Sequence, residues 1–263
     1  MSRAWTPLET GDGSWTLVHG GHGEACHSRE GAWTESVERY GRPCGFGERR
    51  AVGGVRRLLD VGTGLGLNLA AALALLEEAG AGLEAPAGAV ALELEACGLE
   101  LDPGVLAAAL DLGARPQALE GAPRGLRRWW PPVLAALGKA ARRAGERACV
   151  DIRTPTGEAR AGSLRLFVGD GRETLGRALA GGAGAPFDAV FLDAFSPGRA
   201  PELWEGAFLG SLAASLAPGG VLSTFTVNRR VRACLAAAGL EVTDGPAVGR
   251  KRAGTLARRL AFS

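Results

Sequence analysis

Apolar residues along the chain gather in runs of two kinds, which alternate and are separated by glycine, proline and charged residues. Short apolar runs predict buried parallel strands, at residues 57–61, 97–101, 187–192 and 221–226. Longer runs rich in good helix formers predict helices, at residues 68–76, 104–112, 133–143, 201–216 and 228–238. Strands that alternate with helices indicate an α/β fold with a doubly wound, Rossmann-like sheet.

Further elements flank and interrupt this core. A Thr-Gly-Asp-Gly-Ser segment predicts a hairpin over 8–18, and a helix is expected at 34–41, a loop at 42–54 and a closing strand at 256–262. Residues 80–91 and 114–132 are expected to be irregular, the second stretch because it ends in two prolines. Segments 148–153 and 163–168 flank a Thr-Pro-Thr-Gly turn and predict a long hairpin that joins the sheet. We therefore expect an N-terminal extension over 1–54 packed on a core domain over 55–263, with a basic insertion over 114–162.

The first predicted strand ends in a glycine-rich turn, Gly62–Asn68, that leads into a helix. Ligands bind at the carboxyl ends of strands in such sheets, and missing Cβ atoms allow close approach to the backbone. A dinucleotide fingerprint G-x-G-x-x-G needs a third glycine at position 67 or 69, and both positions are leucine. The turn thus predicts a ligand other than a dinucleotide, with a ligand-free strand-to-helix turn as the alternative.

Three acidic residues follow successive predicted strands: Glu100, Asp170 and Asp193. A carboxylate after the second strand is placed to accept hydrogen bonds from ribose hydroxyls, and Asp170 is placed to accept one from an adenine amino group. Each acid alone is equally explained as a solvated helix cap, and Asp193 precedes a helix that begins near Pro201. Their joint position behind the glycine turn favours a binding site.

Charge is distributed unevenly although the net charge is only +2. Residues 58–114 contain acids but neither lysine nor arginine, whereas basic residues dominate from 115 to 165 and after 228. Such a split is the expected footprint of a polyanionic partner, and a merely solvated surface is the alternative.

The positions of the cysteines and histidines bear on the cellular compartment and on metal binding. Five scattered cysteines without a C-x-x-C pair indicate reduced thiols in the cytoplasm, and neither a signal region nor a membrane-spanning apolar stretch is expected. All three histidines, His19, His22 and His27, lie in one glycine-rich segment whose spacing matches no zinc pattern, so we expect no bound metal.

Several motifs carry a resemblance to known enzymes. Asp60 before Gly62-Thr63-Gly64 resembles the first motif of class I S-adenosylmethionine (SAM) methyltransferases, and the acid, aromatic and proline of Phe187–Pro197 resemble amine methyltransferases. With further motifs in order, the chain is similar to the methyltransferase half of the MnmC family or its stand-alone form MnmD. The motifs are His27-Ser28, Gly31–Ser36, Gly62–Asn68, Phe191–Pro197, Ala200–Trp204, Pro218–Thr226 and Gly249–Arg252.

This resemblance implies SAM-dependent methylation of the amino group of 5-aminomethyl-2-thiouridine at the wobble position of tRNA. It implies that Asp193 acts at the amine. It implies that SAM contacts Asp60, Gly62, Thr63, Gly64, Asn68, Glu100, Asp170, Gly171 and Asp193. It implies that the RNA substrate contacts Glu35, Phe195, Pro197, Lys251 and Arg252. Because the chain ends just after its last predicted strand, we expect no FAD-dependent oxidase half and no FAD, and a separate enzyme that makes the aminomethyl group.

Two other functions stay open. A SAM enzyme acting on a small amine, or an aminopropyltransferase of the spermidine synthase type, would need no RNA. A non-catalytic RNA-binding module on the same fold would bind tRNA but not SAM. A serine hydrolase is disfavoured because the sequence contains no G-x-S-x-G.

Overall fold

The computed structural model describes residues 5–48, 54–81, 93–143, 148–180, 186–249 and 253–261. The predicted RNA contacts Lys251 and Arg252, most of the predicted loop at 80–91 and the end of the predicted closing strand lie outside these ranges. Among the described residues, no helix is both long and apolar enough to cross a membrane.

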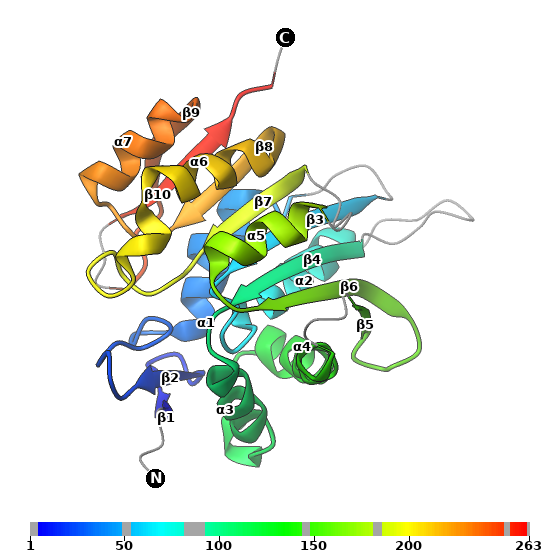
Figure 1. The fold of residues 1–263 in the computed structure, drawn as a ribbon. Coiled ribbons are helices and arrows are strands. Elements are labelled where there is room, and N and C mark those ends of the chain that lie inside the picture. The colour runs from blue at the N-terminus through cyan, green and yellow to red at the C-terminus, as the bar shows by residue number, and fades with distance from the viewer. Residues whose placement is uncertain are drawn as a thin grey trace.

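The described residues form an eight-stranded sheet in the order β5-β6-β4-β3-β7-β8-β10-β9 (Figure 1). Its five central strands are parallel: β6 (Arg160–Val168), β4 (Glu93–Glu100), β3 (Val55–Val61), β7 (Phe187–Leu192) and β8 (Leu216–Thr224). Antiparallel strands close both edges: β5 (Cys149–Arg153) beside β6, and β10 (Gly254–Arg259) and β9 (Leu240–Gly245) beside β8. The predicted doubly wound α/β class is confirmed.

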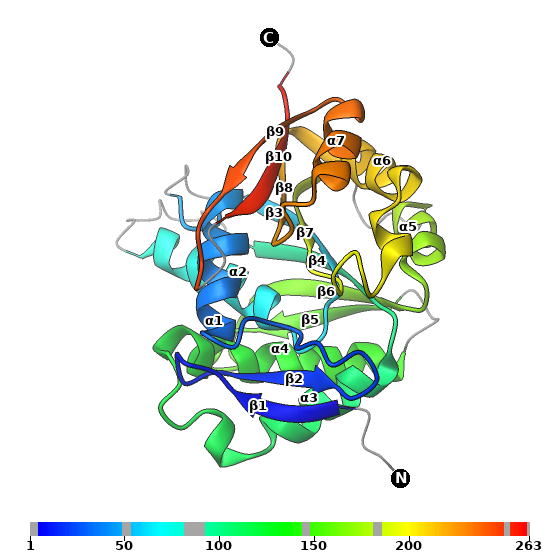
Figure 2. The ribbon, with the colours of Figure 1, turned by 90° about the vertical axis from the view of Figure 1, so that its left-hand side faces the viewer.

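Helices cover both faces of the sheet (Figure 2). One face carries α1 (Ala32–Glu35), α2 (Leu67–Gly80) and α4 (Arg124–Arg142), with α3 (Pro103–Gly113) against α4; the other carries α5 (Gly171–Ala180), α6 (Gly206–Ser215) and α7 (Arg229–Ala237). Successive strand residues feed opposite cores: Leu58 packs with the α2 side and Leu59 with the α5 side. Both are fully buried, which explains why β3 reads as a continuous apolar run.

Helix α4 starts nine residues before the predicted start at Val133, so the prediction of an irregular segment over 114–132 is wrong for its second half. Pro131 and Pro132 lie inside this helix and lack the N–H groups that helical carbonyls one turn earlier would accept. Buried tryptophans hold the segment in place: Trp129 donates to Glu77 (2.9 Å) and Trp130 to the carbonyl oxygen of Leu65 (2.8 Å). Tertiary packing therefore overrides the helix-breaking signal.

Smaller departures concern the second half of the chain. Helix α5 and strand β9 were not predicted; β9 is an edge strand with few buried side chains and so a weak apolar pattern. The predicted helix at 201–216 is divided into a 3-10 helix, η4 (Pro201–Trp204), and α6. Strand β8 begins five residues before the predicted start at Val221, and its register shifts between Phe187 and Ala189 of its partner strand.

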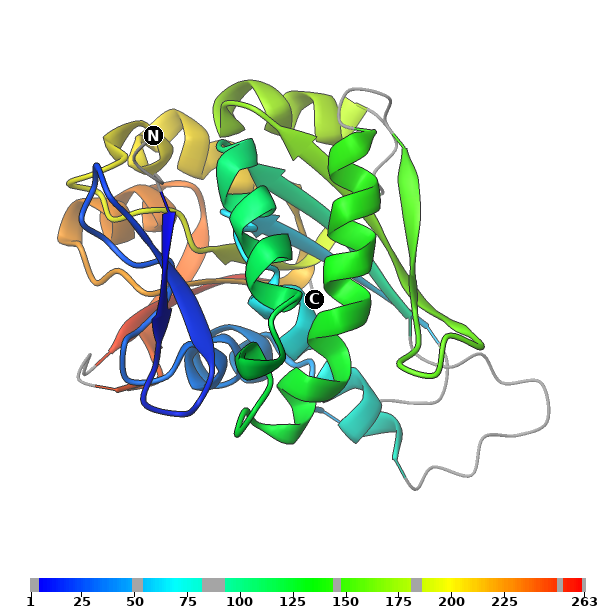
Figure 3. The same ribbon diagram turned by 90° about the horizontal axis from the view of Figure 1, so that it is seen from below.

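The N-terminal hairpin forms as predicted, whereas the helix predicted at 34–41 is an α-helix only as far as Glu35. Strand β1 (Trp5–Glu9) pairs antiparallel with β2 (Trp15–His19), and the pair lies beside α3 (Figure 3). Trp5 donates to Asp102 (2.7 Å), the residue that also caps α3 through the N–H of Gly104 (2.7 Å). After α1 the chain continues as a π-helix, η1 (Ser36–Gly41), and a 3-10 helix, η2 (Arg42–Cys44). Short 3-10 helix η3 (Pro116–Ala118) joins α3 to the loop before α4.

Candidate active site

A cavity of about 710 Å³ opens where β3, β4, β6 and β7 end. Its walls come from two sources: the loops that follow these strands, and the N-terminal segment from Trp5 to Glu35. Predicted site residues that line it are Gly62, Gly64, Glu100, Gly171, Asp193, Phe195 and Glu35. This is the position at which an open α/β sheet binds ligands.

The glycine turn forms the floor of the cavity and requires glycine at its first position. Gly62 has φ 86°, and a Cβ atom there would lie 2.6 Å from the carbonyl oxygen of Asp193. The N–H of Asp193 in turn donates to the carbonyl oxygen of Val61 (2.9 Å). The turn therefore brings the ends of β3 and β7 into direct backbone contact.

Glu100 faces the cavity from the end of β4 and is oriented by main-chain donors. Its carboxylate accepts the N–H of Gly64 (2.8 Å) and the N–H of Asp102 (2.9 Å). Burial raises the pKa of Glu100, and these two backbone hydrogen bonds oppose the rise. A fixed carboxylate beside glycine backbone on the cavity wall is a donor and acceptor set that suits a ribose-bearing cofactor, so the residues present fit SAM.

Asp60 lies beneath the turn and does not reach the cavity. It is completely buried, and neither of its carboxyl oxygens has a hydrogen-bond partner among the described residues. Burial raises the pKa of Asp60 to about 7, against the opposing effect of nearby Asn68 and Thr63. The Oδ1 atom of Asn68 also lacks a partner among these residues, which suits a protonated Asp60 beside it.

Asp193 is the acid most strongly shaped by its surroundings. Its Oδ1 accepts the hydroxyl of Tyr40 (2.5 Å) and its Oδ2 accepts the amide of Asn68 (2.9 Å). The Nε2 atom of His27 lies 3.8 Å from Oδ2. Burial, followed by the nearby charge of Glu35, raises the pKa of Asp193 well above its usual range. Both carboxyl oxygens are therefore oriented by neutral donors, whose hydrogen bonds favour the ionised form and oppose this rise without cancelling it.

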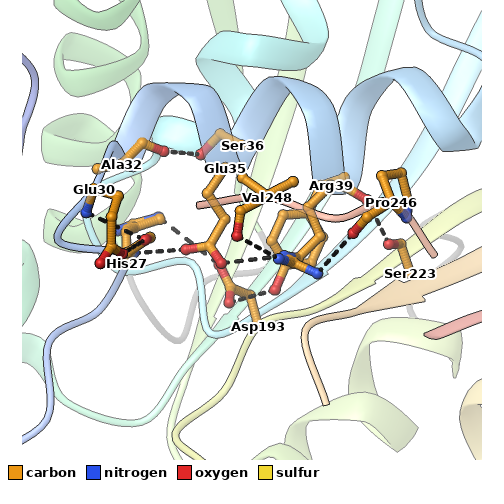
Figure 4. A network of polar contacts seen from close by, with 12 residues as sticks. His27, Glu30, Ala32, Glu35, Ser36, Arg39, Asp193, Ser223, Pro246 and Val248 are labelled. Atoms are coloured by element: carbon orange, nitrogen blue, oxygen red, sulfur yellow. Dashed lines mark hydrogen bonds and ion pairs between the residues drawn. The ribbon is translucent and has the colours of Figure 1, made fainter. Parts of the chain in front are cut away.

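A second buried acid, Glu35, reaches the same place from the end of α1 (Figure 4). It accepts the N–H of Ser28 (2.6 Å) and the Nε–H of Arg39 (3.2 Å), and all of these groups lie around Asp193. Arg39 also donates to the carbonyl oxygens of Pro246 (3.3 Å) and Val248 (3.4 Å). The buried charge of Arg39 is thus paired with Glu35. Arg39 also links the helical segment that carries Glu35 to residues 246–248.

Comparisons with known proteins agree with this geometry. Residues 144–259 match a family model described as S-adenosyl-L-methionine-dependent methyltransferase. The structure of MNMC2 from Aquifex aeolicus superposes with a TM-score of 0.70 at 29% identity, over 98% of this chain and 71% of that chain. Over the matched residues the chain is similar to SAM-dependent methyltransferases of the MnmC type. SAM is the methyl donor that this similarity implies.

Two further comparisons set the limits of this assignment. The tRNA 5-methylaminomethyl-2-thiouridine biosynthesis bifunctional protein MnmC of Aromatoleum aromaticum is 44% identical over 89 residues, which are 34% of this chain. The match spans only 13% of that relative's length. Spermidine synthase from Thermotoga maritima has a TM-score of 0.50 at 13% identity, over 98% of this chain and 69% of that chain, which is a likeness of fold alone.

Not every predicted residue of the MnmC-type site lies on the cavity wall. Asp170 does not line it: its carboxylate pairs with Arg172 (2.5 Å), while its neighbours Gly169 and Gly171 do line it. Pro197 lies in the turn after Phe195 and is also absent from the wall. Thr63 and Asn68 are buried behind the turn, where Asn68 acts on Asp193 rather than facing the cavity.

Two residues of this site, Tyr40 and Arg39, escaped the sequence analysis, as did the contact of His27 with Asp193. Tyr40 is the single tyrosine of the chain, and it reaches Asp193 across 153 positions of sequence. The π-helix that carries it was predicted as ordinary helix, and π-helical turns are frequent at functional sites. The sequence signal that could have pointed to Tyr40 is that the single tyrosine of the chain stands at the end of a predicted helix, directly before Gly41.

Basic residues of the predicted insertion gather away from this cavity. Lys139, Arg142, Arg143 and Arg153 line a second hollow of about 470 Å³ where α4 ends beside β5. Asp151 also lines this hollow and pairs with Arg153 (3.8 Å), and in the first half of α4 Arg128 pairs with Glu77 (2.6 Å). Among the described residues, no group of three or more His, Cys, Asp or Glu side chains could hold a metal ion.

Proposed function

We propose that this chain methylates the amino group of 5-aminomethyl-2-thiouridine at the wobble position of tRNA, giving 5-methylaminomethyl-2-thiouridine. The MnmC relatives are named for the biosynthesis of 5-methylaminomethyl-2-thiouridine in tRNA, which supports this substrate. The observation that carries the proposal is the buried carboxyl of Asp193, which lies on the wall of the cavity beside the glycine turn. An RNA substrate also places the enzyme in the cytoplasm.

Asp193 is suited to hold an amine at a defined angle. When bound, SAM supplies an electrophilic methyl group, and methyl transfer needs an amine whose lone pair is unprotonated and aimed at that carbon. Tyr40 and Asn68 each occupy one oxygen of Asp193, so the carboxylate presents its remaining lone pairs in a fixed direction. An amine N–H bonded there leaves the nitrogen lone pair free to attack.

The raised pKa of Asp193 suits its carboxylate to accept a proton from the substrate amine. A primary amine is mostly protonated near neutral pH and has to lose a proton before it attacks. Burial and the charge of Glu35 raise the pKa of Asp193, which makes its carboxylate a stronger base than an exposed one. A cationic substrate beside Asp193 favours the ionised carboxylate, so substrate binding prepares the base.

The direct experiment combines the protein with labelled SAM and tRNA that carries the aminomethyl group but not the methyl group. Digestion and nucleoside identification should give labelled 5-methylaminomethyl-2-thiouridine. The same tRNA without the aminomethyl group is the control and should stay unlabelled. Label that appears only on a small amine, in the absence of RNA, would contradict the proposal and favour a small-amine transferase. Binding of tRNA without any transfer would favour a non-catalytic RNA-binding module.

A further inference from the structure

Four aromatic or imidazole rings meet on the cavity wall, where Phe195 lies two residues after Asp193 and Trp5 donates to Asp102 (2.7 Å). Trp5 stacks on Phe195 with ring centroids 6.0 Å apart and planes 12° apart. His22 lies 5.1 Å from Phe195 and 4.5 Å from His19, and His19 lies 4.8 Å from Trp5. All four rings line the cavity wall. Neither methyl transfer nor SAM binding, as described above, uses the two histidines.

Hydrogen bonds hold this ring cluster (Trp5, His19, His22 and Phe195) in place. The N–H of His22 donates to Nδ1 of His19 (3.0 Å), so the neutral ring of His19 carries its proton on Nε2. Glu24 accepts the N–H (3.3 Å) and the hydroxyl (3.1 Å) of Ser196, the residue after Phe195. The histidine loop is therefore fastened to the segment that carries Asp193.

The His22 ring is partly exposed and lies between glycines. Gly20, Gly21 and Gly23 are all exposed, and a Cβ atom added at Gly23 would meet no atom within 4 Å. Because these neighbours carry no side chain, they do not cover the His22 ring. Trp5 belongs to the hydrophobic core and Phe195 packs against it, whereas His19 and His22 are partly exposed where the cluster borders the cavity.

We propose that His19, His22 and Phe195 form a stacking platform for an unpaired nucleobase of the RNA substrate. Proteins that recognise single-stranded RNA stack its unpaired bases on aromatic and histidine side chains. An anticodon loop presents such bases. This inference rests on the proposed function, which supplies the RNA, and extends it to how the loop is held.

We call the part of the cavity around Asp193 the acceptor side and the part around Glu100 and Gly169 the cofactor side. Phe195 of the platform belongs to the acceptor side because it follows β7. Glu100 ends β4 and Gly169 follows β6, and both strands lie on the other side of β3. A base stacked on Phe195 and His22 therefore lies near Asp193, where the target amine is expected. The stack would fix the nucleotide whose substituent reaches the carboxyl.

The test compares His22→Ala with His22→Phe for binding to an anticodon stem-loop RNA. Loss of a stacked base weakens binding by about 5- to 150-fold, so His22→Ala should show a loss in this range. His22→Phe keeps a flat ring and should restore most of the affinity. The dependence of affinity on salt should stay at the parent's slope in both variants, because stacking releases no counterions. Thermal unfolding of each variant shows that it is folded.

Three results would overturn the platform. The first is parent-like RNA affinity in His22→Ala. The second is equal weakness of the Ala and Phe variants, which would assign a charge or a hydrogen bond to His22. The third is a matching loss of SAM affinity, which would assign the rings to the cofactor. Methylation assays separate this proposal from the proposed function. If the parent protein binds the RNA, loses affinity on His22→Ala and yet does not methylate the RNA, only the proposed function is contradicted.

Discussion

The two sides of the cavity are held by different kinds of contact. On the cofactor side, backbone groups do the positioning: the N–H groups of Gly64 and Asp102 fix Glu100, and Gly62 contacts the backbone of Asp193. On the acceptor side, side chains from distant segments do it: Tyr40, Asn68 and His27 surround the carboxyl of Asp193. The cofactor side depends on local geometry, and the acceptor side depends on the N-terminal segment packing against the sheet.

This difference separates binding from chemistry. Changes to Glu100 should act mainly on SAM affinity, because its contacts lie on the cofactor side. Changes to Asp193 or its partners should act mainly on the methyl-transfer rate. A single variant that strongly changes both SAM affinity and the methyl-transfer rate would show that the two sides are not independent.

Asp193→Asn should have the largest effect. The amide keeps the shape and one acceptor but cannot take a proton, so single-turnover methyl transfer should slow by about 100- to 10,000-fold, the span for a lost acid–base group. SAM affinity, measured by calorimetry, should change little. Asp111→Asn, on the exposed face of α3, is the matched control and should behave as the parent. A large loss of SAM affinity in Asp193→Asn would mean that Asp193 also holds the cofactor, and the two sides of the cavity would then not be separate.

Asp60→Asn should change how stability depends on pH. Because the folded protein raises the pKa of Asp60 from 3.8 to about 7, it binds this proton more tightly than the unfolded chain does. The free energy of unfolding should therefore fall as pH rises from about 4 to about 7, by up to about 1.4 kcal/mol per pH unit from this group. Asn should remove that part of the slope. Denaturant melts across pH measure it, and an unchanged slope would mean that Asp60 is ionised in the folded protein.

Glu100→Ala should weaken SAM binding by about 1–3 kcal/mol, the scale for lost hydrogen bonds to a charged group. The effect should lie in the dissociation constant from calorimetry. At saturating SAM, the single-turnover rate should stay within a small factor of the parent's rate. A rate loss as large as that of Asp193→Asn at saturating SAM would place Glu100 in the chemistry instead.

Arg142→Ala should have the smallest effect. Arg142 lies in the basic hollow between α4 and β5, so we expect it to contact an RNA phosphate. Its loss should lower the slope of log affinity against log salt by about one. Arg232→Ala is the control, since this guanidinium is paired with Asp244 (2.6 Å) on another face. A parent-like slope for Arg142→Ala would remove the hollow from the RNA interface.

The contrast between the two sides also explains what the sequence could predict. The glycine turn and the strand-end position of Glu100 are local patterns, and local patterns suffice because backbone geometry fixes the contacts. The partners of Asp193 come from residues 27, 40 and 68, which only the tertiary fold brings together. Asp193 itself could be found because it ends a strand, but neither its burial nor its raised pKa has a local signal.

Helix α4 shows the same limit within a single element. Pro131 and Pro132 are strong local signals against a helix, yet the helix continues through them because Trp129 and Trp130 are anchored to α2 and the glycine turn. Asp170 shows the converse. A strand-end position predicts an adenine contact, but in the structure a neighbouring arginine, Arg172, occupies its carboxylate. Binding measurements on Asp170→Asn decide whether SAM displaces that arginine.

The central claim is that Asp193 accepts a proton from the substrate amine, and the most direct test is the pH dependence of single-turnover methyl transfer. Parent and Asp193→Asn are compared at saturating SAM and saturating aminomethyl-uridine tRNA. The parent rate should fall on the acid side as the raised pKa of Asp193 is crossed, since the protonated carboxyl accepts no further proton. The Asn variant should be slow throughout and should rise only as the amine itself loses its proton. An Asn variant with the parent's rate and the parent's acid limb would contradict the account.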